Sequence, residues 1–157
     1  MKSPLSLMLL FVSLGVSTSA LAATPDPSIG TWKLNLEESI APQGIQFRQY
    51  TVVIRSASPE VDWTYSNTDA QGRPYSFTFK GKADGVVRDL PGVPGLKGSM
   101  TLLPSGIVDA KLWSADGSYE NKFCIMGVSL RKQTCMALIK SAGGEVVFFK
   151  QVIDKQD

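Results

Sequence analysis

The 157-residue chain contains no histidine. This absence removes the commonest metal ligand, the usual general base near neutral pH, and the Ser-His and Cys-His nucleophile pairs. Carboxylates at a spacing that forces an acid and a base into one site are also missing, and so is a Ca²⁺ loop of D-x-D-x-D-G form. We therefore expect a protein that is not an enzyme and that has no catalytic residue, no metal site and no cofactor.

An excess of one charge is missing too. The chain has sixteen Lys and Arg residues and fourteen Asp and Glu residues, which gives a net charge of +2. No basic block occurs anywhere in the chain. Phosphate binding requires clustered Lys and Arg side chains. Nucleic acid is therefore not an expected partner.

Only one long hydrophobic run is present, from Leu5 to Val16, with Lys2 before it and the small residues STSALAA after it. This order is typical of a secretory signal peptide, and the run is shorter than the ~20 residues of a membrane-spanning helix. We predict a cleaved signal peptide over residues 1–22 and a single domain over residues 23–157. The expected location is periplasmic or secreted, with no membrane span and, because no cysteine lies near the cleavage site, no lipid anchor.

Helix signals are scarce: only LEESI, residues 36–40, predicts a helical turn, which Pro42 would end. Instead, β-branched and aromatic runs alternate with turn signals such as KADG, ADG and SAGG. We predict an all-β fold, an up-and-down antiparallel β-barrel of eight to ten strands. The expected strands are 30–36, 47–56, 60–68, 73–82, 85–89, 97–103, 106–114, 118–126, 132–140 and 145–153.

The two cysteines, Cys124 and Cys135, flank the polar stretch GVSLRK. Residues on either side of such a turn can face each other across antiparallel strands, and an exported protein meets an oxidising compartment. We predict a structural disulfide. The alternative, a redox-active pair, lacks the C-x-x-C spacing.

Aromatic residues alternate along two strands that the turn DAQG would join. Such rings, with Tyr hydroxyls and a Trp N–H, can form the apolar wall of a ligand pocket, or they can fill the core of the barrel. Both alternatives stay open at this point. The candidate ligand-binding residues are Trp63, Tyr65, Tyr75, Phe77 and Phe79.

The motif GTWKLN, residues 30–35, resembles the first strand of the calycin barrels, the lipocalins and fatty-acid-binding proteins. Together with QYTVVI, DAQGRPYSFTFKGK and VVFFKQV, it is similar to small exported bacterial lipocalin-like proteins. The resemblance implies that Trp32 closes the base of the barrel and that a basic residue of the last strand, Lys150, covers it. A fatty-acid function is not implied, because FFKQV replaces the Arg-x-Tyr of fatty-acid-binding proteins.

These observations predict an exported, non-catalytic lipocalin-like barrel that binds a small apolar or amphipathic molecule. The alternative is an envelope or protein-interaction module, such as an inhibitor, with a fully packed interior and a protein partner. The stretch DLPGVPGLKG, residues 89–98, is either a connector between strands or a loop at the barrel mouth.

Overall fold

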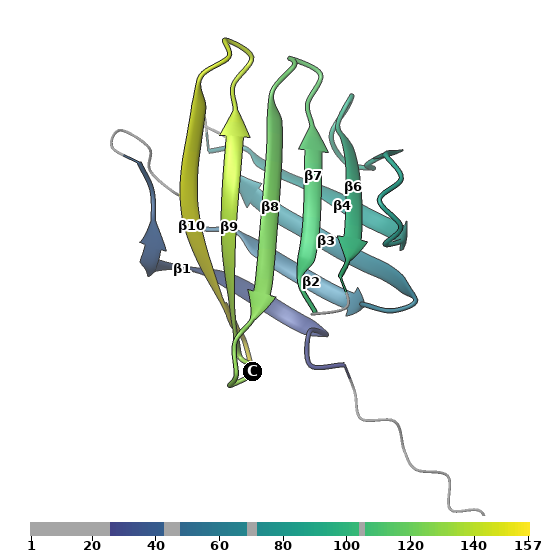
Figure 1. Ribbon diagram of the computed structural model, residues 1–157, viewed down its shortest axis with the longest axis vertical. Coiled ribbons are helices and arrows are strands. Elements are labelled where there is room, and N and C mark those ends of the chain that lie inside the picture. Colours follow the sequence, from purple (N-terminus) through teal and green to yellow (C-terminus); the bar gives the residue numbers. More distant parts are fainter. Residues whose placement is uncertain (1–25, 43–47, 69–71, 104–105) are drawn as a thin grey trace, which may run out of the picture.

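The computed structural model describes residues 26–42, 48–68, 72–103 and 106–157, which form one antiparallel sheet of ten strands (Figure 1). This confirms the predicted all-β fold. Within these ranges, no helix is long and apolar enough to cross a membrane. The predicted signal peptide lies outside the described residues. The strands are β1 (Gly30–Ile40), β2 (Thr51–Ser56), β3 (Glu60–Thr68), β4 (Pro74–Lys82), β5 (Arg88–Asp89), β6 (Lys97–Leu102), β7 (Val108–Trp113), β8 (Tyr119–Met126), β9 (Lys132–Lys140) and β10 (Val146–Lys155).

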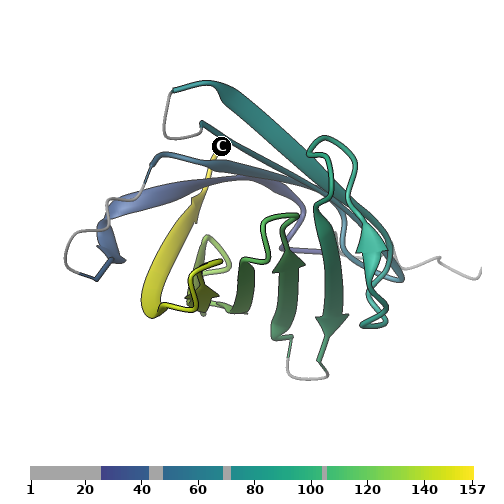
Figure 2. The ribbon, with the colours of Figure 1, turned by 90° about the horizontal axis from the view of Figure 1, so that it is seen from above.

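The sheet has the up-and-down order expected from the turn signals. The strands follow the sequence β4-β3-β2-β1-β10-β9-β8-β7-β6-β5, so that the first strand pairs with the last. In Figure 1, β6 to β10 form the front wall and β1 to β4 cross behind it, and Figure 2 shows the sheet curling so that the two walls face each other. The inward faces of both walls therefore build a shared core.

The two edges of the sheet, β4 and β5–β6, are joined by the Pro/Gly-rich stretch 89–98. The backbone N–H of Thr78 in β4 donates a hydrogen bond of 3.0 Å to the carbonyl of Pro91. Gly92 (φ 110°) lies so close to β4 that an added Cβ would be 2.1 Å from the carbonyl oxygen of Ser76. Leu90 and Leu96 are buried. The stretch therefore acts as more than a connector, because it covers the gap that strand pairing leaves open.

The segment LEESI is part of β1, so the predicted helical turn is wrong. Its pairing with β10 shifts register between Asn35 and Ile40. At this bulge the hydroxyl of Ser39 accepts a hydrogen bond of 2.9 Å from the Val152 N–H and donates one to the carbonyl of Asn35. The neighbouring strand thus provides hydrogen bonds that an isolated helical turn would lack.

The core forms two clusters of buried apolar residues. One, around Phe79, Met100 and the two cysteines, lies between β3–β4 and β6–β9. The other, around Trp32, Tyr50 and Ile153, lies beneath β1, β2 and β10. Trp63 packs against both clusters. The candidate ligand wall therefore stands at the centre of the barrel.

Candidate functional site

The β3–β4 hairpin brings the predicted aromatic residues together. Trp63 pairs with Phe79, and Tyr65 pairs with Phe77. The rings of Tyr65 and Phe77 stack with centroids 5.0 Å apart. Tyr75 lies nearer the end of the hairpin, half-exposed, with its ring centroid 6.3 Å from that of Tyr65. The five residues thus form one continuous wall, as alternation on joined strands predicts.

An interior space of about 90 Å³, the core cavity, lies against this wall. Trp63, Tyr65, Phe77 and Phe79 all line it, and Ala110 belongs to its opposite wall on β7. The side chains of the described residues do not fill the barrel interior. Since an apolar cavity of about 150 Å³ accepts a benzene molecule, the core cavity accepts a group of about three or four carbon atoms.

A second space of about 340 Å³, the mouth cavity, adjoins the core cavity. Tyr75 lines it, together with Ser114 and Ser118 at the β7–β8 turn. Five residues line both cavities and so mark their boundary. These boundary residues are Tyr65, Phe77, Leu112, Glu120 and Lys122.

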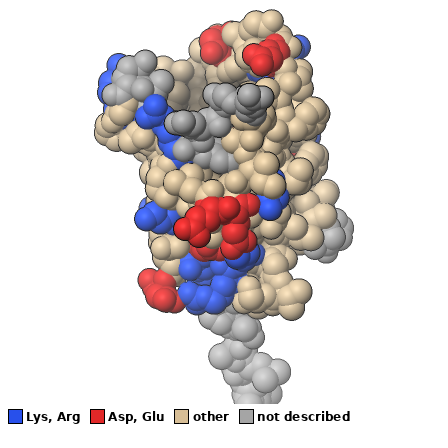
Figure 3. All heavy atoms as spheres, turned by 90° about the vertical axis from the view of Figure 1, so that its left-hand side faces the viewer, with Lys and Arg blue, Asp and Glu red and all other residues tan. Residues whose placement is uncertain are grey.

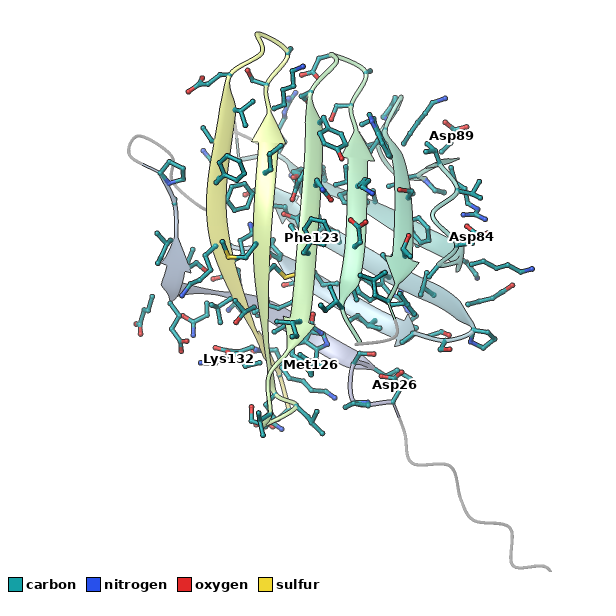
Figure 4. All side chains as sticks on the ribbon, viewed as in Figure 1. Asp26, Asp84, Asp89, Phe123, Met126 and Lys132 are labelled. Atoms are coloured by element: carbon teal, nitrogen blue, oxygen red, sulfur yellow. A yellow bond between two sulfur atoms is a disulfide. The ribbon has the colours of Figure 1, made fainter. Side chains whose placement is uncertain are left out.

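A third space, of about 300 Å³, lies at the opposite end of the barrel, where Figure 4 labels Asp26 and Met126. We call it the base cavity. Trp63 reaches it as well as the core cavity. Among the described residues, the buried Nε1–H of Trp63 has no hydrogen-bond partner. Buried donors in proteins are almost always paired, so this N–H is available to an acceptor from outside the chain.

Glu120 and Lys122 form an ion pair inside the barrel, and sequence reasoning missed them. The Lys122 Nζ lies 2.9 Å from Oε1 of Glu120, and the two side chains are only 17% and 23% exposed. The same Nζ lies 5.6 Å from the ring centroid of Tyr50 and 5.9 Å from that of Tyr65. Burial lowers the pKa of Lys122, but Glu120 and Tyr65 outweigh this effect, and its pKa lies above the ordinary value. Lys122 is therefore charged at neutral pH.

A signal for this pair exists in the sequence. Side chains two residues apart on a strand share a face. Glu120 and Lys122 therefore share a face of β8 with Cys124, and the burial of Cys124 in the structure shows that this face points inward. The apolar Phe123 then faces outward, as its label on the front of β8 shows (Figure 4).

Tyr50 and Tyr65 supply further polar atoms near the pair. The Tyr50 hydroxyl donates a 3.0 Å hydrogen bond to Oε1 of Gln151, and the Tyr65 hydroxyl accepts one of 3.0 Å from Asn67. Burial raises the pKa of both tyrosines above the usual range, with a smaller contribution from Glu120, and for Tyr65 it outweighs the opposing effect of Lys122. Both side chains are therefore neutral at physiological pH.

The predicted disulfide between Cys124 and Cys135 is confirmed. The two residues face each other across β8 and β9 with their Cα atoms 4.0 Å apart. Both are buried, and both line the core cavity. The bond therefore ties together two strands of the cavity wall.

Trp32 is fully buried, and its Nε1–H donates a 2.8 Å hydrogen bond to the carbonyl of Ser28. The cation above its ring is Lys155, whose Nζ lies 5.6 Å from the ring centroid. The prediction of Lys150 is wrong, because β10 extends beyond residue 153 and its register sets Trp32 opposite Lys155. Lys150 instead pairs with Ile40.

The outer face of β8 to β10 carries several exposed apolar side chains. Phe148 is 66% exposed and Met136 is 55% exposed, and both line a shallow groove with Ile40. Charges on the face turned toward the viewer in Figure 3 are mixed in sign. Lys132 pairs with Glu38 and lies 3.9 Å from Asp154.

Comparisons with known proteins agree on the fold. No protein-family model and no curated protein matches this chain. The crystal structure of a mutant of the fluorescent protein UnaG matches with a TM-score of 0.56 and 14% identity, covering 83% of this chain and 97% of that one. A redesigned β-barrel matches with a TM-score of 0.50 and 16% identity, covering 83% and 93%. The chain therefore shares the antiparallel β-barrel fold of these two structures.

Proposed function

We propose that this protein binds one small apolar or amphipathic molecule inside the barrel and is not an enzyme. The observation that carries the proposal is the aromatic wall of the β3–β4 hairpin, which faces a core cavity that side chains leave unfilled. Binding sites for small molecules are typically apolar hollows with a few oriented polar groups. The unpartnered N–H of Trp63 and the pair formed by Glu120 and Lys122 are such groups.

The alternative, an interaction module with a packed interior, has less support. It requires a filled barrel, whereas the core cavity adjoins the larger mouth cavity. Its remaining support is the exposed apolar surface around Phe148 on the outer face of β10. An experiment on ligand binding must therefore separate the interior from this outer face.

Titration with the uncharged fluorophore N-phenyl-1-naphthylamine, which is too large for the core cavity alone and would occupy the core and mouth cavities together, tests the proposal. We expect one probe molecule to bind per chain and to change the Trp emission. This change should be smaller in the variant Trp63→Phe, which would assign it to Trp63. The variant Ala110→Phe places a ring in the core cavity and should weaken binding by about tenfold or more.

Two control variants locate the bound probe. Phe148→Ser removes the most exposed ring of the outer face and should leave the affinity unchanged. Trp32→Phe should weaken the fold without altering the affinity of the folded protein. A folded wild-type protein that binds no probe, or whose binding disappears in Phe148→Ser, would contradict the proposal.

We also propose that the protein acts outside the cytoplasm, in the periplasm or as a secreted protein. The buried bond between Cys124 and Cys135 supports this location, since structural disulfides persist in oxidising compartments.

A further inference from the structure

The Glu120–Lys122 ion pair stands at the boundary between the core and mouth cavities, where any ligand that occupies both must pass it. We propose that the ligand carries, at this boundary, an uncharged polar group that both donates and accepts hydrogen bonds, such as an amide. This inference rests on the proposed function. It assigns Glu120 and Lys122 as the residues that select the polar group of the ligand.

The surroundings of the pair are apolar or uncharged. In the sheet, Glu120 stands between Leu112 of β7 and Ile139 of β9, and Lys122 stands between Ala110 and Ala137. Among the described residues that line the core and mouth cavities, these two are the only charged ones. The other polar side chains that line the two cavities carry hydroxyl groups, apart from the amide of Gln133 and the indole N–H of Trp63. The interior therefore presents one positive and one negative charge side by side, and no net charge.

This arrangement disfavours a charged ligand of either sign. An anion attracted to Lys122 meets the repulsion of Glu120, whose carboxylate oxygen is only 2.9 Å from the ammonium nitrogen. A cation attracted to Glu120 meets Lys122 in the same way. Displacing one partner leaves the other charge buried and unpaired, which is strongly unfavourable. A neutral amide can accept a hydrogen bond from Lys122 and donate one to Glu120 while the pair stays intact.

The volumes of the two cavities indicate how large the parts of the ligand on either side of the polar group are. A group of about three or four carbon atoms fits the core cavity beyond the pair, and the mouth cavity of about 340 Å³ holds a larger part. The polar group is therefore flanked by a short apolar end and a bulkier one.

Competition among three six-carbon compounds tests the inference: hexanamide, hexanoate and hexylammonium. Each is added to the wild-type protein with bound N-phenyl-1-naphthylamine at pH 7, and the displacement of this probe is measured; the three compounds differ only in their polar end. We expect hexanamide to bind about tenfold more tightly than either charged compound. The order of affinities in the wild-type protein tests the preference for a neutral polar group directly, so this test does not depend on whether a variant folds.

Two variants should change which of the three compounds binds most tightly. Glu120→Gln leaves Lys122 without a counter-charge, so hexanoate should become the preferred compound. Lys122→Met leaves Glu120 alone, so hexylammonium should become preferred. Asp109 and Lys111 provide a matched control, because they form an ion pair of the same spacing and length, 2.9 Å, on β7. Asp109→Asn and Lys111→Met should keep the wild-type ranking.

The outcomes separate the two proposals. If the fluorescent probe does not bind the folded protein, the proposed function fails and this inference fails with it. If the probe binds but hexanamide is not preferred, or if no compound displaces the probe, the inference fails and the proposed function stands. A ranking that stays the same in Glu120→Gln and Lys122→Met would also overturn the role given to these residues.

Discussion

Breaking the disulfide between Cys124 and Cys135 should lower the free energy of unfolding by about 3 kcal/mol. The bond closes a loop with a sequence separation of 11 residues. In the chain-entropy model, a loop of this size restricts the unfolded chain by about 3 kcal/mol at 25 °C. The folded state changes little, because the β8–β9 ladder holds the two residues opposite each other with or without the bond. The loss therefore arises mainly in the unfolded state.

Urea unfolding followed by Trp fluorescence measures this effect, with and without a reductant. Reduction should lower the unfolding midpoint and raise the m-value, since the reduced unfolded chain exposes more surface. The double variant Cys124→Ser and Cys135→Ser should match the reduced protein, because the two hydroxyls can hydrogen-bond to each other in the apolar wall. A loss below about 1 kcal/mol would refute the loop-closure argument. Free thiols that titrate in the unreduced, folded protein would refute the bond itself.

Two further predictions concern the Pro/Gly-rich stretch 89–98 and the buried tyrosines. Gly92→Ala should lower the free energy of unfolding, measured in urea, by at least about 2 kcal/mol, because its Cβ would meet the Ser76 carbonyl at a positive φ. The control Gly117→Ala, with open space around it, should lower the free energy of unfolding by about 1 kcal/mol. Equal losses in the two variants would contradict the close packing of Gly92. Burial raises the folded-state pKa of Tyr50 and Tyr65 above the unfolded value of about 10, so stability should be unaffected by these groups below pH 10 and fall above it by about 1.4 kcal/mol per pH unit for each tyrosine. Urea unfolding between pH 8 and pH 11.5 measures this slope, which Tyr65→Phe should roughly halve; an unchanged slope in that variant would contradict the assignment.

The strands and their turns could be predicted from the sequence because their signals are local. Glycines at turn positions such as Gly85 and Gly117 adopt the positive φ that such turns require. The alternation of rings on β3 and β4 placed Trp63 and Phe77 on one face, and short turns between successive strands favoured the up-and-down order. The cysteine pair followed in the same way, from its placement on both sides of a turn.

The predictions that failed depend on contacts between strands. The resemblance implies Lys150 over Trp32, as the basic residue of the predicted strand 145–153. The register with β1, set by pairing along both strands, puts Lys155 there instead. Likewise, residues 36–40 form part of a strand instead of the predicted helical turn, because they hydrogen-bond to β10. The local sequence does not specify these hydrogen bonds.

By itself, the sequence determined an all-β chain, the approximate positions of its strands, the cysteine pairing and the aromatic wall, because each follows from residues close together in the chain. Only the tertiary structure decided which face of β8 points inward, so that Glu120 and Lys122 enter the interior while Phe123 faces outward. Only the tertiary structure, too, left the core cavity unfilled and placed the ion pair at its boundary. Strand alternation defines two faces without saying which one is covered, and the volume left inside a barrel depends on how side chains from opposite walls meet.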